Sequence, residues 1–302
     1  MRDALTNIAL LTIALTLGGC ASLPAPSPPP PDGLRVISYN VALGALLSTP
    51  SPRFSRLTRS EPSIRAALID RPELRDFDIL GLQEICGPEV SAQLEALKTL
   101  GPYAIFFARA DLDRPGECRK GQAILSRYPI LDQGVIRLPP ARRVGRAAAW
   151  IEISLPDGPT RVRVYNVHLD NSANPPLEPQ EARLLQIQPV LAHMLAWRQS
   201  QPSSAVIVLG DLNTLEERDT TERDREPTLL TMSALLTPST DRFVSTHALS
   251  YQTDWIFFDG LRLRRSGAVR LLLSDHYPLV ADFDLPKPRA AASRTALTDP
   301  LR

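Results

Sequence analysis

A series of short apolar segments, rich in β-branched and aromatic residues, constrains the fold of this chain more than any other feature. The segment Ala205–Gly210 (AVIVLG) is apolar throughout, as in a strand buried on both faces. Apolar residues recur at helical spacing in Ser63–Asp76, Pro88–Leu100 and residues 178–198, and these three segments are predicted helices. Many strands with few helices predict an α+β or α/β sandwich, in which two sheets pack together and helices cover them. The predicted strands are Leu34–Asn40, Asp78–Gln83, Tyr103–Ala108, Gln122–Ser126, Ala147–Ile153, Arg161–Val167, Ala205–Gly210, Asp254–Phe258, Leu261–Leu272 and Leu279–Asp284.

The predicted strands and helices form one domain, residues 34–285, because no repeat or linker divides this region. The chain has 302 residues, of which 43% are hydrophobic and 22% charged, as in a globular protein with a buried core. The formal net charge of +1 does not indicate a polyanion-binding protein, although a local basic patch could still contact nucleic acid. Residues 286–302 are rich in Pro, Ala and Arg, and we expect them to be disordered.

Residues 1–19 have the features of a signal peptide. The apolar run Ile8–Leu17 is too short to span a bilayer and suits the apolar core of such a peptide. It leads into LGGC, which ends at Cys20 and resembles the lipobox of bacterial lipoproteins; this implies cleavage before Cys20 and lipidation of its thiol. The proline-rich residues 20–33 would then tether the domain to the cell envelope, in the outer membrane facing the periplasm since no Asp follows the cysteine. An ordinary secretory signal with an incidental cysteine is the alternative.

Two cysteines remain, Cys86 and Cys118. An exported compartment permits a disulfide, and two cysteines are the number that one disulfide requires. A structural disulfide is therefore the favoured interpretation, and two free thiols are the alternative.

Polar residues suited to catalysis stand next to six of the predicted strands, where a rigid sheet can direct side chains into a common cleft. One such residue alone has a plain explanation as a turn or cap residue, but six strand ends make coincidence the weaker explanation. Carboxylates and amides without a cysteine cluster form a hard oxygen site, suited to Mg²⁺ or Mn²⁺ rather than to structural zinc. The sequence lacks a serine-nucleophile elbow, a P-loop and a dinucleotide fingerprint. The residues are Asn40, Glu84, His168, Asp170, Asp211, Asn213, Asp254, Asp275 and His276.

These residues stand in six ordered motifs that resemble those of the endonuclease/exonuclease/phosphatase family, which includes deoxyribonucleases, neutral sphingomyelinases and inositol-polyphosphate phosphatases. Each motif alone is weak, but the ordered set covers Leu34 to Leu285. The resemblance implies a four-layer α/β sandwich, with two mixed or antiparallel sheets packed together and flanked by helices. The motifs are Ser38-Tyr39-Asn40, Leu82-Gln83-Glu84, Asn166-Val167-His168-Leu169-Asp170, Gly210-Asp211-Leu212-Asn213, Thr253-Asp254-Trp255-Ile256 and Ser274-Asp275-His276-Tyr277-Pro278-Leu279.

The resemblance also implies a metal site. Glu84 would be the principal ligand of Mg²⁺ or Mn²⁺, Asn40 would touch the metal or the phosphate, and Asp275 would be a further carboxylate near the metal.

For the reacting groups, the resemblance implies that Asp211 orients or deprotonates the attacking water and that Asn213 holds a phosphate oxygen. His168 would donate to a non-bridging oxygen or to the leaving group. His276 would be held by a hydrogen bond to Asp254. Whether Asp211 or His276 is the base stays open.

Other candidates are weaker. Arg146 resembles a family arginine that contacts phosphate, and with Arg142 and Arg143 it forms a basic cluster that is either a solvated loop or a phosphate-steering patch. His193 is interpreted as a surface or packed residue of a helix. His247 stands in a polar loop, where a turn role is the plainer interpretation.

The predicted function is therefore divalent-metal-dependent hydrolysis of a phosphoester, nuclease-like, with the substrate unresolved. A phospholipid, sphingomyelin or inositol phosphate is the alternative substrate, and a non-catalytic binding lipoprotein on the same fold is the alternative of a different class. The partners expected are a phosphoester, with nucleic acid as a candidate, and a membrane through the lipid anchor; no obligate protein partner is evident.

Overall fold

The computed structural model describes residues 33–41, 68, 70–86, 94, 97–109, 120–141, 146–155, 160–171, 177–271 and 273–285. The residues outside this part include the signal peptide, Cys20, the tether up to residue 32, Cys118, Arg142, Arg143 and the residues after 285; the side chain of Cys86 is also outside it. The elements are β1 (Gly33–Asn40), β2 (Ile79–Cys86), β3 (Ala104–Arg109), β4 (Lys120–Ser126), β5 (Ile130–Leu138), β6 (Arg146–Ser154), β7 (Arg161–His168), α4 (Pro179–Ser200), β8 (Ala205–Glu216), η1 (Glu222–Asp224), α5 (Pro227–Ser233), β9 (Thr237–Pro238), β10 (Gln252–Asp259), β11 (Arg262–Ala268) and β12 (Leu279–Asp284).

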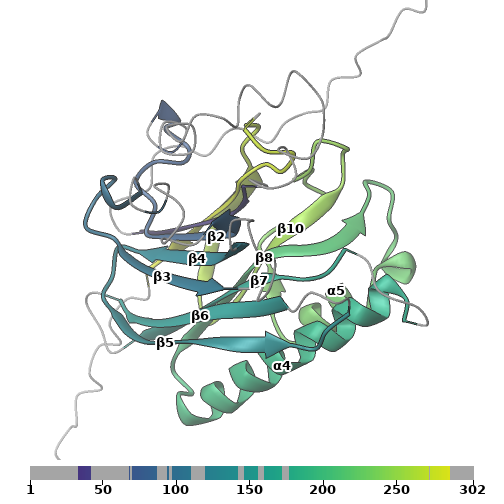
Figure 1. The fold of residues 1–302 in the computed structure, drawn as a ribbon, viewed down its shortest axis with the longest axis horizontal. Coiled ribbons are helices and arrows are strands. Elements are labelled where there is room, and N and C mark those ends of the chain that lie inside the picture. Colours follow the sequence, from purple (N-terminus) through teal and green to yellow (C-terminus); the bar gives the residue numbers. More distant parts are fainter. Residues whose placement is uncertain are drawn as a thin grey trace, which may run out of the picture.

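The strands form two six-stranded sheets that pack face to face (Figure 1). The first sheet has the order β11-β12-β1-β2-β4-β3, and the second has the order β5-β6-β7-β8-β10-β9. Each sheet contains one parallel pair, β1 with β2 and β7 with β8, and its other pairs are antiparallel. The predicted α/β sandwich of two mixed sheets is confirmed.

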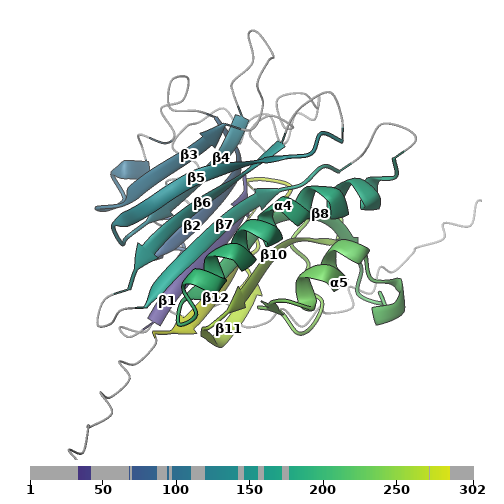
Figure 2. The same cartoon turned by 90° about the horizontal axis from the view of Figure 1, so that it is seen from below.

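The pleat of the strands divides the apolar side chains into three cores. Successive residues of a strand point to opposite faces, so Ile207 and Leu209 of β8 pack between the sheets, whereas Val206 and Val208 face the helices. Figure 2 shows α4 and α5 lying across the outer face of the second sheet, where they cover this helix-side core. On the outer face of the first sheet, Leu68, Leu94 and Leu97 come from helical residues of the two earlier predicted helices, of which only parts are described.

One polar link crosses the apolar space between the sheets. The side chain of Gln83 in β2 donates to Oδ1 of Asn166 in β7 over 2.7 Å, and Nδ2 of Asn166 donates to the carbonyl of Leu82 over 2.9 Å. Gln83 and Asn166 are fully buried. Because an unpaired buried amide is costly, this link stabilises only one alignment of the two sheets.

The structure corrects several of the predicted element boundaries. β5, β9 and α5 were not predicted; the polar and glycine residues 132–134 interrupt the apolar pattern of β5, which has mostly exposed side chains. β8 continues beyond Gly210 to Glu216, so Asp211 and Asn213 lie within a strand and not after it. β11 ends at Ala268 and not at Leu272. Within the described residues, no helix has both the length and the apolar character needed to cross a membrane.

Candidate active site

The polar residues of the six motifs meet at one edge of the sandwich, in the space between the sheets. Alternate residues of a strand point to the same face of the sheet. Val36, Val164 and Ile256 lie in the core between the sheets, and each is an even number of residues from a site residue of the same strand: Asn40, His168 and Asp254. The two parallel pairs bring the carboxyl ends of their strands together, and the register pairs Asp254 of β10 directly with Asp211 of β8. Strand pairing and pleat therefore assemble the site from distant segments of the chain.

Asp211 lies at the centre of this cluster and is fully buried. Its Oδ2 accepts a hydrogen bond from Nδ2 of Asn40 over 2.8 Å and lies 3.5 Å from Nε2 of His168 and 3.7 Å from Nε2 of His276. Its Oδ1 accepts from the backbone N–H of Asn213 over 2.8 Å. Burial raises the pKa of Asp211 above its ordinary value, and the charge of His276 and the two hydrogen bonds only partly offset this effect. Asp211 is therefore a stronger proton acceptor than an ordinary aspartate.

His276 is held as a cation by its carboxylate neighbours. Its Nδ1 lies 2.8 Å from Oδ2 of Asp254, a fully buried carboxylate that also accepts from the hydroxyl of Thr253 over 3.0 Å. Burial alone would lower the pKa of His276, but the charges of Asp254 and Asp211 outweigh it and raise the pKa to about 10. The predicted bond between His276 and Asp254 is present.

The tautomer of His168 is determined by Arg146. Nη1 of Arg146 lies 2.9 Å from Nδ1 of His168, and a guanidinium can only donate, so Nδ1 accepts. In the neutral ring the proton then stands on Nε2, which lies 3.9 Å from Oε1 of Glu84 and faces the centre of the site. Nε of Arg146 donates to Oδ1 of Asp170 over 2.9 Å, and Gln186 of α4 donates to the other oxygen over 2.8 Å. The structure thus places Arg146, predicted as a phosphate contact, behind His168.

Glu84 and Asn213 both have left-handed backbone conformations, with φ of 57° and 52°. Glu84 stands at an irregularity between β2 and β4, where the register shifts between Leu82 and Ile85, and its side chain is 21% exposed. The amide of Asn213 donates to the carbonyl of Leu169 over 2.9 Å. Such strained positions persist only when the surrounding structure holds them, and they cluster at functional sites.

The donor set fits a hard divalent cation. Four carboxylates, those of Glu84, Asp211, Asp254 and Asp275, stand at this edge of the sandwich near the cationic His276, so the site carries net negative charge. The carboxylate oxygens of Asp211 and Asp254 lie within 4.8 Å of each other. Oxygen donors of this kind suit Mg²⁺ and Mn²⁺.

Sequence reasoning missed His247, which the structure places beside the motif residues. Its Nε2 lies 3.7 Å from Oδ2 of Asp275, and its ring centroid lies 4.9 Å from that of His276. Burial would raise the pKa of Asp275, but the His247 ring that faces its carboxylate and the charge of His276 lower it below its ordinary value. The polar loop around His247 gives no signal in the sequence, because an isolated bridge between residues 247 and 276 creates the contact.

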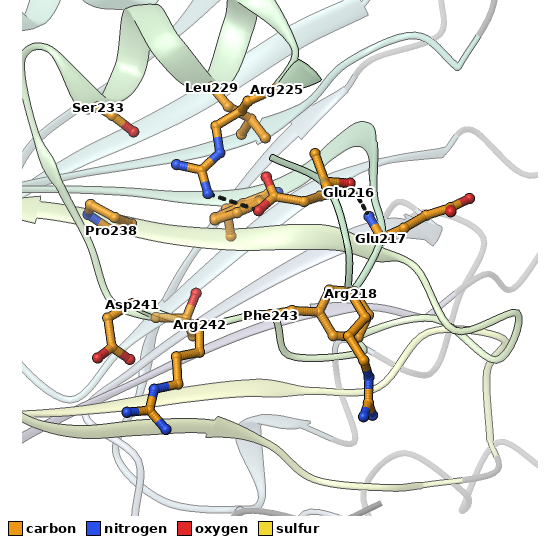
Figure 3. Close-up of a pocket in the computed structure, with 13 residues that line it drawn as sticks. Glu216, Glu217, Arg218, Arg225, Leu229, Ser233, Pro238, Asp241, Arg242 and Phe243 are labelled. Carbon is orange, nitrogen blue, oxygen red and sulfur yellow. Dashed lines mark hydrogen bonds and ion pairs between the residues drawn. The ribbon is translucent and has the colours of Figure 1, made fainter. Parts of the chain in front are cut away.

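A separate pocket of about 220 Å³ lies on the other face of the second sheet (Figure 3). Trp255 and Leu229, which line it, belong to the helix-side core, whereas Asp211 faces the space between the sheets. In Figure 3, Arg225 reaches Glu216, to which it donates over 2.9 Å, and Arg218 lies on the other side of the pocket. This pocket is not part of the candidate active site.

The sequence from residue 37 to residue 276 matches the model of the endonuclease/exonuclease/phosphatase family. This range is most of the chain and includes every candidate site residue from Asn40 to His276. The protein belongs to the endonuclease/exonuclease/phosphatase family. None of the curated proteins matches the chain.

Solved structures share the fold at low sequence identity. A conserved protein of unknown function from Enterococcus faecalis V583 is 19% identical, with a TM-score of 0.63 over 83% of this chain and 99% of that one. The human nocturnin catalytic domain with bound sulfate anion is 18% identical, with a TM-score of 0.62 over 85% and 96%. Truncated Caenorhabditis elegans TDP2 is 20% identical, with a TM-score of 0.57 over 84% and 98%. These likenesses support the fold alone.

Proposed function

We propose that this protein hydrolyses phosphodiester bonds with the help of Mg²⁺ or Mn²⁺. The observation that carries the proposal is the environment of Asp211, a buried carboxylate in contact with Asn40 and close to one neutral and one cationic histidine. Such a constellation can accept a proton from water on one side and oppose phosphate charge on the other. Family membership supports the same reaction class.

In the proposed mechanism, Asp211 orients the attacking water and accepts its proton, because burial raises its proton affinity. His276, kept protonated by Asp254, opposes the negative charge that develops on the phosphate. In this proposal Asp211, rather than His276, is the base, since a protonated imidazole cannot accept a proton. His168 donates its Nε2–H to a non-bridging oxygen or to the leaving group.

The metal would be held by Glu84, Asn40 and Asp275, and when bound it supplies Lewis-acid polarisation of the phosphoryl oxygens. Asn213 would hold a phosphate oxygen after its amide leaves the carbonyl of Leu169. Arg146 orients His168 and so contributes to substrate binding only through it.

The favoured substrate class is a nuclease-like phosphodiester, and a phospholipid, sphingomyelin or inositol phosphate is the second candidate. We also propose that the chain is anchored through a lipid on Cys20 to the outer membrane, facing the periplasm, which would present the site to substrates at a membrane surface. A binding protein without activity on the same fold is the contrasting candidate; the filled site argues against it.

The test is hydrolysis by the full chain of plasmid DNA, RNA, sphingomyelin, an inositol phosphate and bis-p-nitrophenyl phosphate, each with Mg²⁺, Mn²⁺ or EDTA. We expect metal-dependent cleavage of one class, lost in Glu84→Gln while circular dichroism shows an intact fold. Glu217→Gln, an exposed glutamate in the separate pocket, is the control and should keep full activity. Absence of cleavage of every substrate, with metal bound, would favour the binding protein.

A further inference from the structure

His247 contacts both functional residues of the segment before β12. Its Nε2 lies 3.7 Å from Oδ2 of Asp275, and its ring stands nearly perpendicular to that of His276, at 86° with centroids 4.9 Å apart. Backbone bonds fix this approach, because the N–H of Ala248 donates to the carbonyl of Asp275 over 2.7 Å and that of Tyr277 donates to Thr246 over 2.7 Å. The position of the His247 ring is therefore set by the fold.

The orientation of the His247 proton is also set. The backbone N–H of Leu249 donates to Nδ1 of His247 over 3.1 Å, so Nδ1 is an acceptor. The proton of the neutral ring then stands on Nε2, the atom that faces Asp275. His247 thus presents a donor to the carboxylate.

Packing alone does not hold the carboxylate of Asp275, because its side chain is 40% exposed. The hydroxyl of Ser274 lies 3.3 Å from Oδ1 of Asp275 but donates over 2.8 Å to the carbonyl of Asn40. A hydroxyl has one proton, and the shorter bond to Asn40 takes it. The N–H of His247 is directed at this carboxylate.

We propose that His247 is a positioning residue of the active site, which holds the carboxylate of Asp275 through Nε2–H and holds the ring of His276 by direct contact. A residue that binds a metal or a phosphate acts only in the correct orientation, and the groups behind it supply that orientation. This proposal rests on the proposed function of the same site, and it adds a third histidine to the two of the family motifs.

The test compares two substitutions of His247. His247→Phe keeps a ring against His276 but removes the donor, whereas His247→Gln has an N–H donor at similar reach but no ring. On the phosphodiester that the wild type cleaves, we expect His247→Phe to lower kcat about 10- to 100-fold, with little change in KM. We expect His247→Gln to recover most of this loss. His193→Phe is the control, since His193 contacts Tyr165 and Trp150 far from Asp275.

Equal kcat for His247→Phe and wild type would overturn the proposal. Equal losses in the Phe and Gln variants, with equal falls in thermal stability, would show a purely structural role and would overturn it too.

Two measurements do not depend on turnover. Imidazole ¹⁵N NMR of the full chain should show His247 with its proton on Nε2, and Mn²⁺ binding should weaken about tenfold in His247→Phe but not in His247→Gln. The opposite tautomer, or unchanged Mn²⁺ affinity in His247→Phe, contradicts the proposal. A wild type that cleaves no phosphoester but gives both expected results would instead contradict the proposed function and leave this role of His247 supported.

Discussion

Replacing Arg146 by Met removes the two hydrogen bonds that join it to Asp170 and to His168. A hydrogen bond to a charged group contributes about 1.5–3 kcal/mol. If the transition state loses the contribution of the bond to His168, kcat falls about 10- to 150-fold, since each 1.4 kcal/mol is a factor of ten in rate. KM should change little, because Arg146 lies behind His168 and holds its tautomer.

The same substitution also affects folding, and a double variant separates the two effects. Asp170 is buried, so removing its cationic partner lowers the free energy of unfolding by up to about 3 kcal/mol. This is the lower end of the range for a buried ion pair, because Arg146 is 20% exposed and Gln186 still donates to Asp170. Changing Asp170 to Asn in the Arg146→Met background removes the unpaired charge. Stability should then recover in part, whereas kcat should stay low because His168 still lacks its donor.

The assay is steady-state hydrolysis of the cleaved phosphodiester by wild type, Arg146→Met, Arg146→Lys and the double variant, with urea unfolding of each. Arg146→Lys keeps the charge but cannot contact both partners, and it should be intermediate. A raised KM with unchanged kcat would refute the reasoning and would instead favour the direct phosphate contact that the sequence suggested. Recovery of kcat in the double variant would refute it as well.

Three further predictions use other parts of the structure. The pKa of His276 is raised from 6.5 to about 10, so the stability that its charge contributes is complete below pH 6.5 and is lost as the pH rises to 10. In EDTA, the difference in Tm between wild type and His276→Gln should therefore be largest near pH 6 and shrink toward pH 10. A constant difference would contradict this. Gly210→Ala should destabilise the fold by about 3 kcal/mol or more in urea unfolding, because φ is 143° and an added Cβ would lie 1.8 Å from the carbonyl oxygen of Val167; an unchanged midpoint would show that the strand can relax there. Cys20→Ser should move the protein from the membrane fraction to the soluble fraction, and unchanged fractionation would argue against the lipid anchor.

Strands with strong apolar patterns were predicted from the sequence, and strands with weak patterns were not. β12 was predicted with its observed bounds, Leu279–Asp284, because its residues are buried from Leu279 to Phe283, and Leu279, Ala281 and Phe283 fill the core between the sheets. β5 was missed because most of its side chains are exposed and its composition does not favour a strand; its hydrogen-bonded pairing with β6 stabilises it instead. Local composition therefore predicts a strand well only where the strand is buried, because a buried strand requires apolar residues.

The same distinction holds for the candidate site. Asp211 and His276 stand in motifs that can be read along the chain, and the structure brings them to 3.7 Å. The positions of Arg146 behind His168 and of His247 beside Asp275 depend on contacts between segments distant in sequence, so neither could be predicted from local pattern. Residue types predicted the chemistry of the site, and tertiary contacts determined which groups orient it.

The pairing of β1 with β12 has a consequence for how the molecule acquires activity. The buried bond between Arg35 and Asp282 joins residues 247 positions apart. Closing a loop of that length costs on the order of 5 kcal/mol in chain entropy, so this pairing forms only when the strands between them are available to offset it. Asn40 is the last residue of β1, and His276 precedes β12. A truncated or still-emerging chain without β12 therefore lacks the assembled site, and we expect no activity until β12 has docked.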